Sequence, residues 1–366
     1  MKSSNQRNFI DKESIFGPDN YKPLPVVLSR AKGVWVWDVD DNKYLDMMSA
    51  YSAVSHGHSH PELLKVLHEQ SSQLALTSRA FYTDTLGPYL ETITSLSNFD
   101  MALPMNSGAE AVETAIKAAR RWAYLSKKIE SNKAEIIVAD GNFHGRTTTI
   151  ISFSSDANSK NDFGPHTPGF VSVEFGSAKA IEQAINENTA AVLIEPIQGE
   201  GGIIVPPENF LPEVREICTK NNVLMILDEV QSGLGRTGKM FAFQHSNIQP
   251  DGLILGKALG GGFMPVSCFL ASKEVMQWLT PGSHGSTFGG NPLAAAIGKK
   301  SLELLEEENL IENSRVLGDF FKEALINIKS NVIKEVRGKG LWIGVVIDTN
   351  YVSGKDLSKL LLKEGI

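Results

Sequence analysis

Short apolar runs alternate with longer helical patterns along most of the chain, and this alternation limits the possible folds more than any other feature. The runs EIIVAD, FVSVEF, AAVLIEP, VLMILDE and GLILGKA have the length of buried strands, and helical segments such as AKAIEQAINEN and FLPEVREICTKN lie between them. This pattern predicts an α/β fold with a mainly parallel central sheet. Ligands bind at the carboxyl ends of such strands, so the residues after each run are the candidate site.

Both ends of the chain depart from this pattern. Residues 35–38 and 43–46 predict a hairpin, and a long helical pattern with the strand-like run LWIGVVID lies near the other end. At 366 residues the chain is long enough for one large and one small domain. We expect a large domain over residues 56–295 and a small α+β domain built from residues 1–55 and 296–366.

The composition narrows the kind of partner. A formal net charge of -7 argues against nucleic acid or an anionic membrane, because both favour a basic surface. Two cysteines are too few for a disulfide scaffold, the N-terminal residues contain no apolar stretch of a secretion signal, and no apolar run is long enough to cross a membrane. The expectation is a cytoplasmic protein that binds small molecules.

The glycine-rich stretch DEVQSGLGRTGK at 228–239 resembles two nucleotide-binding motifs. A phosphate loop requires Ser or Thr after its lysine, but position 240 is Met. A dinucleotide fingerprint requires a helix after the glycines, whereas KMFAFQHSNIQP is short and ends at Pro250. The glycines are therefore expected to shape a loop.

A carboxylate and an amine at neighbouring strand ends suggest a different ligand. Asp228 ends the apolar run VLMIL, and Lys257 follows LIL inside a glycine-rich loop. The alternatives are a helix cap or a structural ion pair for Asp228, and a solvated surface position for Lys257. A lysine in a dry site has a lowered pKa and can form a Schiff base, and a buried carboxylate needs a cationic partner. Together the two residues suggest pyridoxal 5'-phosphate (PLP), whose aldehyde and ring nitrogen would meet these groups.

Other parts of the chain match the remaining demands of this cofactor. The helix that begins near Ser107, Gly108 and Ala109 offers backbone amides for a phosphate, although an ordinary helix cap would look the same. Phe143 follows another strand and offers an apolar ring, with a plain core residue as the alternative. His144 either packs at the cofactor's edge or faces solvent.

Several long motifs in register resemble the class III pyridoxal-phosphate aminotransferases. They are NSGAEAVETAIKAAR, GNFHGRT, EPIQGEGG, ILDEVQSGLGRTGK, LGKALGGG and HGSTFGGNPLA. The resemblance implies the fold type I of PLP-dependent aminotransferases. It also implies that Lys257 bonds the cofactor and moves the reacting proton, that Asp228 pairs with the ring nitrogen, and that Gln231 lies near the ring hydroxyl. Val230 and Phe143 are implied to pack on the two ring faces.

The resemblance further implies a shared active site in a homodimer. Ser107, Gly108 and Ala109 would hold the phosphate, and Thr287 would reach the phosphate of the neighbouring subunit. The stretches NYKPLPVVLSRAKGVWVWDVDDNKYLDMMSAYSAVSHGHSHP and LTSRAFYTDTLGPY are similar to the ornithine aminotransferases within this family. The implied reaction transfers the δ-amino group of L-ornithine to 2-oxoglutarate, giving glutamate and glutamate 5-semialdehyde, which cyclises to pyrroline-5-carboxylate.

Four residues match the family's substrate positions. Arg146 and Tyr21 would bind the α-carboxylate of ornithine, because a guanidinium bonds a carboxylate through two parallel contacts. Tyr51 would distinguish ornithine from related amines. Glu200 would mask a second arginine, which the family pattern places beyond Ile366.

Three alternatives stay open from the sequence. Acetylornithine and 4-aminobutyrate aminotransferases share the Lys257, Asp228 and Arg146 positions. Without the second arginine, the chain would be an impaired or silent subunit. The motif SHGHSHP places His56, His58 and His60 at alternate positions, but without supporting carboxylates or cysteines a structural role is expected rather than a metal site.

Overall fold

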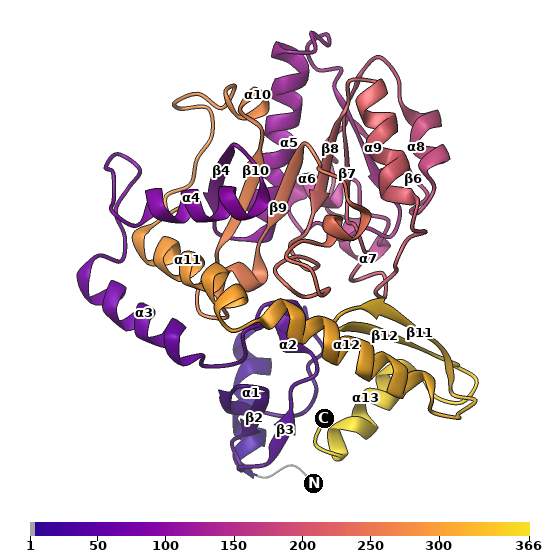
Figure 1. The fold of residues 1–366 in the computed structure, drawn as a ribbon. Coiled ribbons are helices and arrows are strands. Elements are labelled where there is room, and N and C mark those ends of the chain that lie inside the picture. Colours follow the sequence, from indigo (N-terminus) through magenta and orange to yellow (C-terminus); the bar gives the residue numbers. More distant parts are fainter. Residues whose placement is uncertain (1–3) are drawn as a thin grey trace.

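The computed structural model describes residues 4–366 and is built around a seven-stranded sheet with the order β4-β10-β9-β8-β7-β5-β6 (Figure 1). The strands β6, β5, β7, β8 and β9 pair in parallel, whereas β10 runs antiparallel to both of its neighbours. The predicted mainly parallel sheet is confirmed. Its strands are β4 (Met101–Met105), β5 (Glu135–Ala139), β6 (Phe170–Val173), β7 (Thr189–Ile194), β8 (Leu224–Asp228), β9 (Gly252–Leu255) and β10 (Ser267–Ala271).

Helices bury both faces of this sheet, which explains why its strands are continuous apolar runs. Successive residues of β8 point to opposite faces: Met225 and Leu227 join one core, and Ile226 joins the other. The first core contains side chains of α4 (Leu86–Ser97), α8 (Ala178–Ala184), α9 (Phe210–Lys220) and α11 (Pro292–Glu307). The second contains α5 (Gly108–Leu125) and α10 (Lys273–Met276). Short segments α6 (Thr148–Ile151), α7 (Ala157–Lys160), η1 (Ala242–Ser246) and η2 (Lys257–Gly260) lie in the connections.

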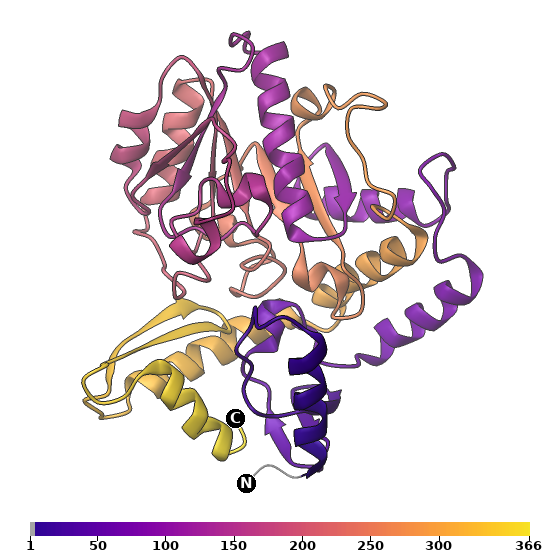
Figure 2. The same ribbon diagram turned by 180° about the vertical axis from the view of Figure 1, so that it is seen from behind.

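The two chain ends lie together below the large sheet in both ribbon views (Figures 1 and 2). The Leu45 amide donates a hydrogen bond of 2.8 Å to the Gly365 carbonyl, which joins them directly. The predicted hairpin is present, because Trp35 pairs with Leu45 in an antiparallel ladder. The N-terminal elements are α1 (Ser4–Phe16), β1 (Leu28–Lys32), β2 (Trp35–Asp38), β3 (Lys43–Leu45), α2 (Ser49–Ser52) and α3 (Pro61–Gln73). The C-terminal ones are α12 (Leu310–Ile326), β11 (Ile333–Lys339), β12 (Trp342–Ile347) and α13 (Gly354–Lys363).

The carboxyl ends of β5, β7, β8 and β9 meet at one edge of the sheet because these strands are parallel. The start of the antiparallel strand β10 lies at the same edge, where the Ser267 hydroxyl donates a hydrogen bond of 2.7 Å to the Ser107 carbonyl just before α5. The loops that follow the apolar runs therefore converge there. Among residues 4–366, no helix has the length and apolar character needed to span a membrane.

Candidate active site

The first turn of α5 offers free backbone donors to the site. Ser107 is the N-cap, and its hydroxyl accepts a hydrogen bond of 3.2 Å from the Glu110 amide. Glu110 in return accepts the Ser107 amide at 2.7 Å, so the chain before the helix is fixed. The amides of Gly108 and Ala109 belong to the first turn, where N–H groups have no partner within the helix. An 18-residue helix also places partial positive charge at this end, which suits an anion.

Asp228 ends β8 as a buried carboxylate with two protein donors. His144 Nδ1 lies 2.7 Å from Asp228 Oδ2, and the Val230 amide donates to Oδ1 at 3.0 Å. The His144 side chain is fully buried, so its predicted solvent-facing alternative is wrong. Burial would lower the pKa of His144, but the hydrogen bond and charge of Asp228 raise it above its usual value. This contact fixes the carboxylate's orientation.

Lys257 begins η2 with a left-handed backbone, at φ 46°. Burial lowers the pKa of its amine below the usual value, although the charges of Asp228 and Glu200 oppose the shift. Lys257 and Asp228 line one cavity of about 180 Å³ together with Gly108 and Ala109 of α5. The amine, the carboxylate and the helix N-terminus that the sequence predicted separately therefore meet in one place.

The walls of this small cavity include both predicted ring-packing residues, Phe143 and Val230, and also Gln231. Val230 packs against the start of α5, because a Cβ on Gly108 would lie only 3.0 Å from Val230 Cγ1. Glu195 is a further lining residue that the sequence analysis missed. Its carboxylate accepts the Phe143 amide at 3.1 Å and the Gly199 amide at 3.3 Å, and burial raises its pKa to about 7.

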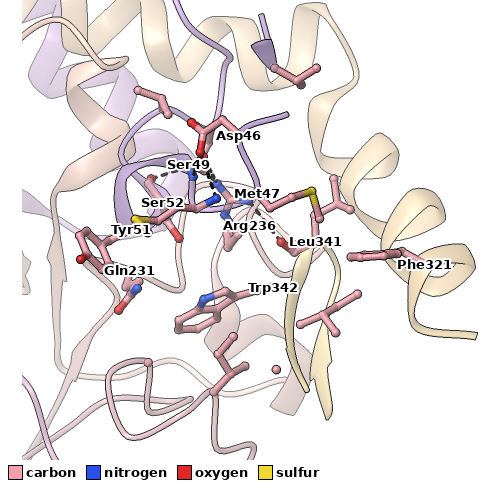
Figure 3. Close-up of a pocket in the computed structure, with 18 of the residues that line it drawn as sticks. Asp46, Met47, Ser49, Tyr51, Ser52, Gln231, Arg236, Phe321, Leu341 and Trp342 are labelled. Carbon is pink, nitrogen blue, oxygen red and sulfur yellow. Dashed lines mark hydrogen bonds between the residues drawn. The ribbon is translucent and has the colours of Figure 1, made fainter. Parts of the chain in front are cut away.

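A larger cavity of about 800 Å³ lies beside the first and is lined by the predicted substrate residues Tyr51 and Glu200. Figure 3 shows Tyr51 in the wall of this cavity. Gln231 lines both cavities, so the two lie on either side of one residue. Trp342 of β12 forms another wall, and a Cβ on Gly199 would overlap both its ring and the Gln231 side chain. The close packing around Gly199 brings the C-terminal segment of the chain to the candidate site.

Four other predicted residues, Ser107, Arg146, Tyr21 and Thr287, do not line these two cavities within the described chain. Ser107 instead lines a neighbouring cavity together with Gly108 and Lys257. The Arg146 guanidinium lies 5.7 Å from the centre of the Phe143 ring and is exposed. Tyr21 is 67% exposed, and Thr287 is also exposed in the loop before α11. Their roles in substrate binding and in a neighbouring subunit's site stay predictions.

The glycine-rich stretch at 228–239 forms a loop, as expected, and not the start of a regular helix. Glu229 is fully buried and accepts the amides of Ala242 and Phe243 at 2.6 and 2.7 Å, which closes the loop. Burial raises the pKa of Glu229 to about 8. Arg236 of this loop lines the larger cavity, and the sequence analysis did not predict this position.

The three alternate histidines have separate structural partners. His56 Nε2 lies 2.8 Å from the Ser301 carbonyl oxygen, His58 Nε2 lies 2.7 Å from Asp46 Oδ2, and His60 Nε2 lies 3.1 Å from Glu308 Oε2. Over residues 4–366, no group of three or more histidine, cysteine or acidic side chains has the geometry of a metal site.

Comparison with known proteins places this site in a family. A model of the class-III aminotransferases matches residues 16–366. An ornithine aminotransferase of Macrococcus caseolyticus is 56% identical over 342 residues, which are 93% of this chain and 86% of that protein.

Two solved structures extend the comparison. An ornithine aminotransferase of Toxoplasma gondii, with partial occupancy of PLP at its active site, has a TM-score of 0.97 at 41% identity and covers 99% of this chain and 86% of its own. An acetylornithine aminotransferase of Elizabethkingia anophelis has a TM-score of 0.88 at 48% identity, with 99% and 90% covered. Matches of this extent confirm the resemblance found in the motifs: the chain belongs to the class-III aminotransferases.

Proposed function

We propose that the protein is a PLP-dependent ornithine aminotransferase, which transfers the δ-amino group of L-ornithine to 2-oxoglutarate. The observation that carries the proposal is the meeting of Lys257, Asp228 and the N-terminus of α5 around one cavity. The similarity to ornithine aminotransferases over most of the chain supports the choice of substrate.

The chemistry of the donors fits PLP. The amides of Gly108 and Ala109 suit its phosphate, Asp228 suits a protonated ring nitrogen, and Val230 with Phe143 offers apolar ring contacts. Ser107, beside them, would complete the phosphate site. When bound, the cofactor supplies an aldehyde that bonds amines and a ring that takes up electrons from the substrate carbon.

The chain's own residues then divide the work. Lys257 Nζ has a lowered pKa, so more of it is the neutral base that can take a proton from the substrate carbon and return it. Asp228 stays oriented through His144 Nδ1 and the Val230 amide. Gln231 lines both cavities and would lie near the ring hydroxyl.

We assign substrate binding to two residues that line the larger cavity, Tyr51 and Glu200, and to two that lie outside it, Arg146 and Tyr21. Arg146 and Tyr21 would bind the α-carboxylate, which must lie away from the reacting δ-amine. Tyr51 would contact the substrate chain, and Glu200 would adjust the charge of the pocket between the amine substrate and the oxo acid. Two carboxylates on 2-oxoglutarate and one on ornithine make such an adjustment necessary.

A homodimer is part of the proposal, with Thr287 of each subunit directed to the phosphate of the other. A cytoplasmic location and the division into domains at residues 55 and 295 are also proposed. The second boundary falls inside α11, which packs against α3 and α4 of the preceding region.

The test is a turnover assay with the purified chain and added PLP. We expect L-ornithine and 2-oxoglutarate to give pyrroline-5-carboxylate, trapped as a coloured adduct with 2-aminobenzaldehyde, and borohydride to fix the cofactor on Lys257. The similarity to an acetylornithine enzyme makes N-acetylornithine the necessary competitor. Faster turnover of N-acetylornithine than of ornithine would show that the proposed substrate is wrong. A borohydride adduct on another lysine would refute the assignment of Lys257.

A further inference from the structure

The segment Ser49–Ser52, here called the left-handed turn, has an unusual backbone. Its four residues have φ values of 52°, 45°, 56° and 74°, and none is glycine. L-residues avoid this conformation because the Cβ atom approaches the following carbonyl, so a run of four persists only where its surroundings hold it. Tyr51, the proposed substrate-selecting residue, is the third member of the turn.

One arginine holds both ends of the left-handed turn. Arg236 Nη2 donates hydrogen bonds to Ser49 Oγ at 3.1 Å and to Ser55 Oγ at 2.8 Å. The Ser55 hydroxyl in turn donates to the Ser52 carbonyl at 3.1 Å. Arg236 therefore binds the first residue directly and the last residue through Ser55.

Two further contacts fix this arrangement in the molecule. Arg236 Nη1 donates to the Leu341 carbonyl at 3.2 Å, which ties the turn to the segment before β12. Asp46 accepts the amides of Met48 and Ser49 at 3.0 and 2.8 Å, so it holds the entry to the turn. Figure 3 shows Arg236 among these groups, with Tyr51 and Gln231 at the same side of the cavity.

We propose that Arg236 is a positioning residue that maintains the left-handed turn and thereby sets Tyr51 over the substrate cavity. Arg236 belongs to the loop that also carries Asp228 and Gln231, so the position of Tyr51 is set relative to the residues of the small cavity. Burial lowers the pKa of Arg236 to about 10, and it stays cationic at neutral pH. The consequence for substrate selection rests on the proposed ornithine activity, whereas the effect on the turn does not.

The principal experiment measures amide hydrogen exchange over residues 46–58 without substrate. In R236Q we expect these amides to exchange roughly tenfold faster or more, because the hydrogen bonds from Arg236 to Ser49 and Ser55 are lost. A glycine at Ala50 should slow this exchange again, since glycine adopts positive φ without strain. The matched control is Ala53→Gly, at φ -82°, which should give no rescue.

The kinetic readout then tests the link to selectivity. R236Q should lower kcat/KM for ornithine by roughly tenfold, mainly through KM, and reduce the preference for ornithine over 4-aminobutyrate. A50G should restore part of both, and A53G should not. If R236Q only reduced the amount of folded, PLP-loaded protein, the activities toward ornithine and 4-aminobutyrate would fall by the same factor.

Each outcome bears on the proposal. Unchanged exchange in R236Q, or equal rescue by both glycines, would overturn it whatever the enzyme's substrate. Faster exchange with unchanged selectivity would overturn the role of Tyr51 alone. If R236Q does not fold, S55A removes the hydrogen bonds from Arg236 to Ser55 and from Ser55 to the Ser52 carbonyl but keeps the bond from Arg236 to Ser49, and it must show the same direction of change. Absence of ornithine turnover in the unmodified protein would reject the proposed function and leave the exchange test standing.

Discussion

The pair formed by His144 and Asp228 allows a quantitative test of how the site is held. Both side chains are buried, at 0% and 5% exposure, and their Nδ1 and Oδ2 atoms are 2.7 Å apart. His144→Phe keeps an aromatic ring of similar shape beside Phe153 but removes the donor. The carboxylate then keeps only the Val230 amide, and we expect the free energy of unfolding to fall by about 1.5–3 kcal/mol, the usual value for a hydrogen bond to a charged group.

Asp228→Leu removes the other partner and leaves a buried imidazole with neither nitrogen bonded, since His144 Nε2 has no partner among the described residues. This variant should lose about 1–3 kcal/mol. In the double variant both members of the pair are absent, and the only donor left without its acceptor is the Val230 amide, as it already is in Asp228→Leu, so the two losses should not add. The expected coupling energy is about 2 kcal/mol.

The assay is urea unfolding of the cofactor-free protein, followed by tryptophan fluorescence, for the four members of the cycle. Because the folded pKa of His144 is raised, its contribution is complete below the unfolded histidine pKa and is lost as pH rises through the folded value. The coupling energy should therefore be larger at pH 6 than at pH 9. A coupling below about 0.5 kcal/mol at pH 6 would refute the reasoning.

Other residues give shorter tests. Lys257→Ala should lower ornithine turnover by roughly 10³-fold, the range for loss of an acid–base group, and abolish the borohydride adduct, whereas unchanged turnover would remove the lysine from the mechanism. In the unmodified chain, the rate of PLP addition should rise with pH to a midpoint below the ordinary lysine pKa of 10.5, measured by stopped-flow absorbance. Glu229→Gln should cost about 1–3 kcal/mol in urea unfolding, because its amide nitrogen would face a backbone donor; equal stability would show that the loop does not depend on the second oxygen. Arg146→Lys should raise KM for ornithine about tenfold with little change in kcat, since an ammonium cannot make the two parallel contacts, and a fall in kcat alone would contradict a role in binding.

Strand ends were the part of the site most open to prediction. Asp228 ends one apolar run and Lys257 follows the next, and the parallel order of their strands brings both to one edge. Ser107 follows β4 and lies at the same edge, where its carbonyl accepts the Ser267 hydroxyl of β10. The apolar runs predict where the strands are but not their directions, and the antiparallel direction of β10 was seen only in the structure. Spacing within the sequence gives no information on this direction, because it depends on how the chain returns to the sheet.

The contacts that the sequence did not predict join distant segments. His144 and Asp228 are 84 positions apart, and their bond depends on the placement of β5 and β8 in the sheet. Arg236 meets Ser49 from 187 positions away, and nothing in either local pattern predicts a left-handed backbone. Local conformational propensities depend on residues that are close in the sequence, so these long-range contacts could be found only in the folded structure.

Because β10 runs antiparallel to its neighbours, the segment that precedes it lies at the same edge of the sheet as the candidate site. In a fully parallel sheet, a connection entering a strand would lie at the opposite edge, far from bound ligand. Here residues 262–266 lead into Ser267, whose hydroxyl supports the carbonyl that begins α5. A change of one residue in the length of that connection would therefore be transmitted to the first turn of α5, so this entry loop should tolerate insertions less well than the distant loop between α5 and β5.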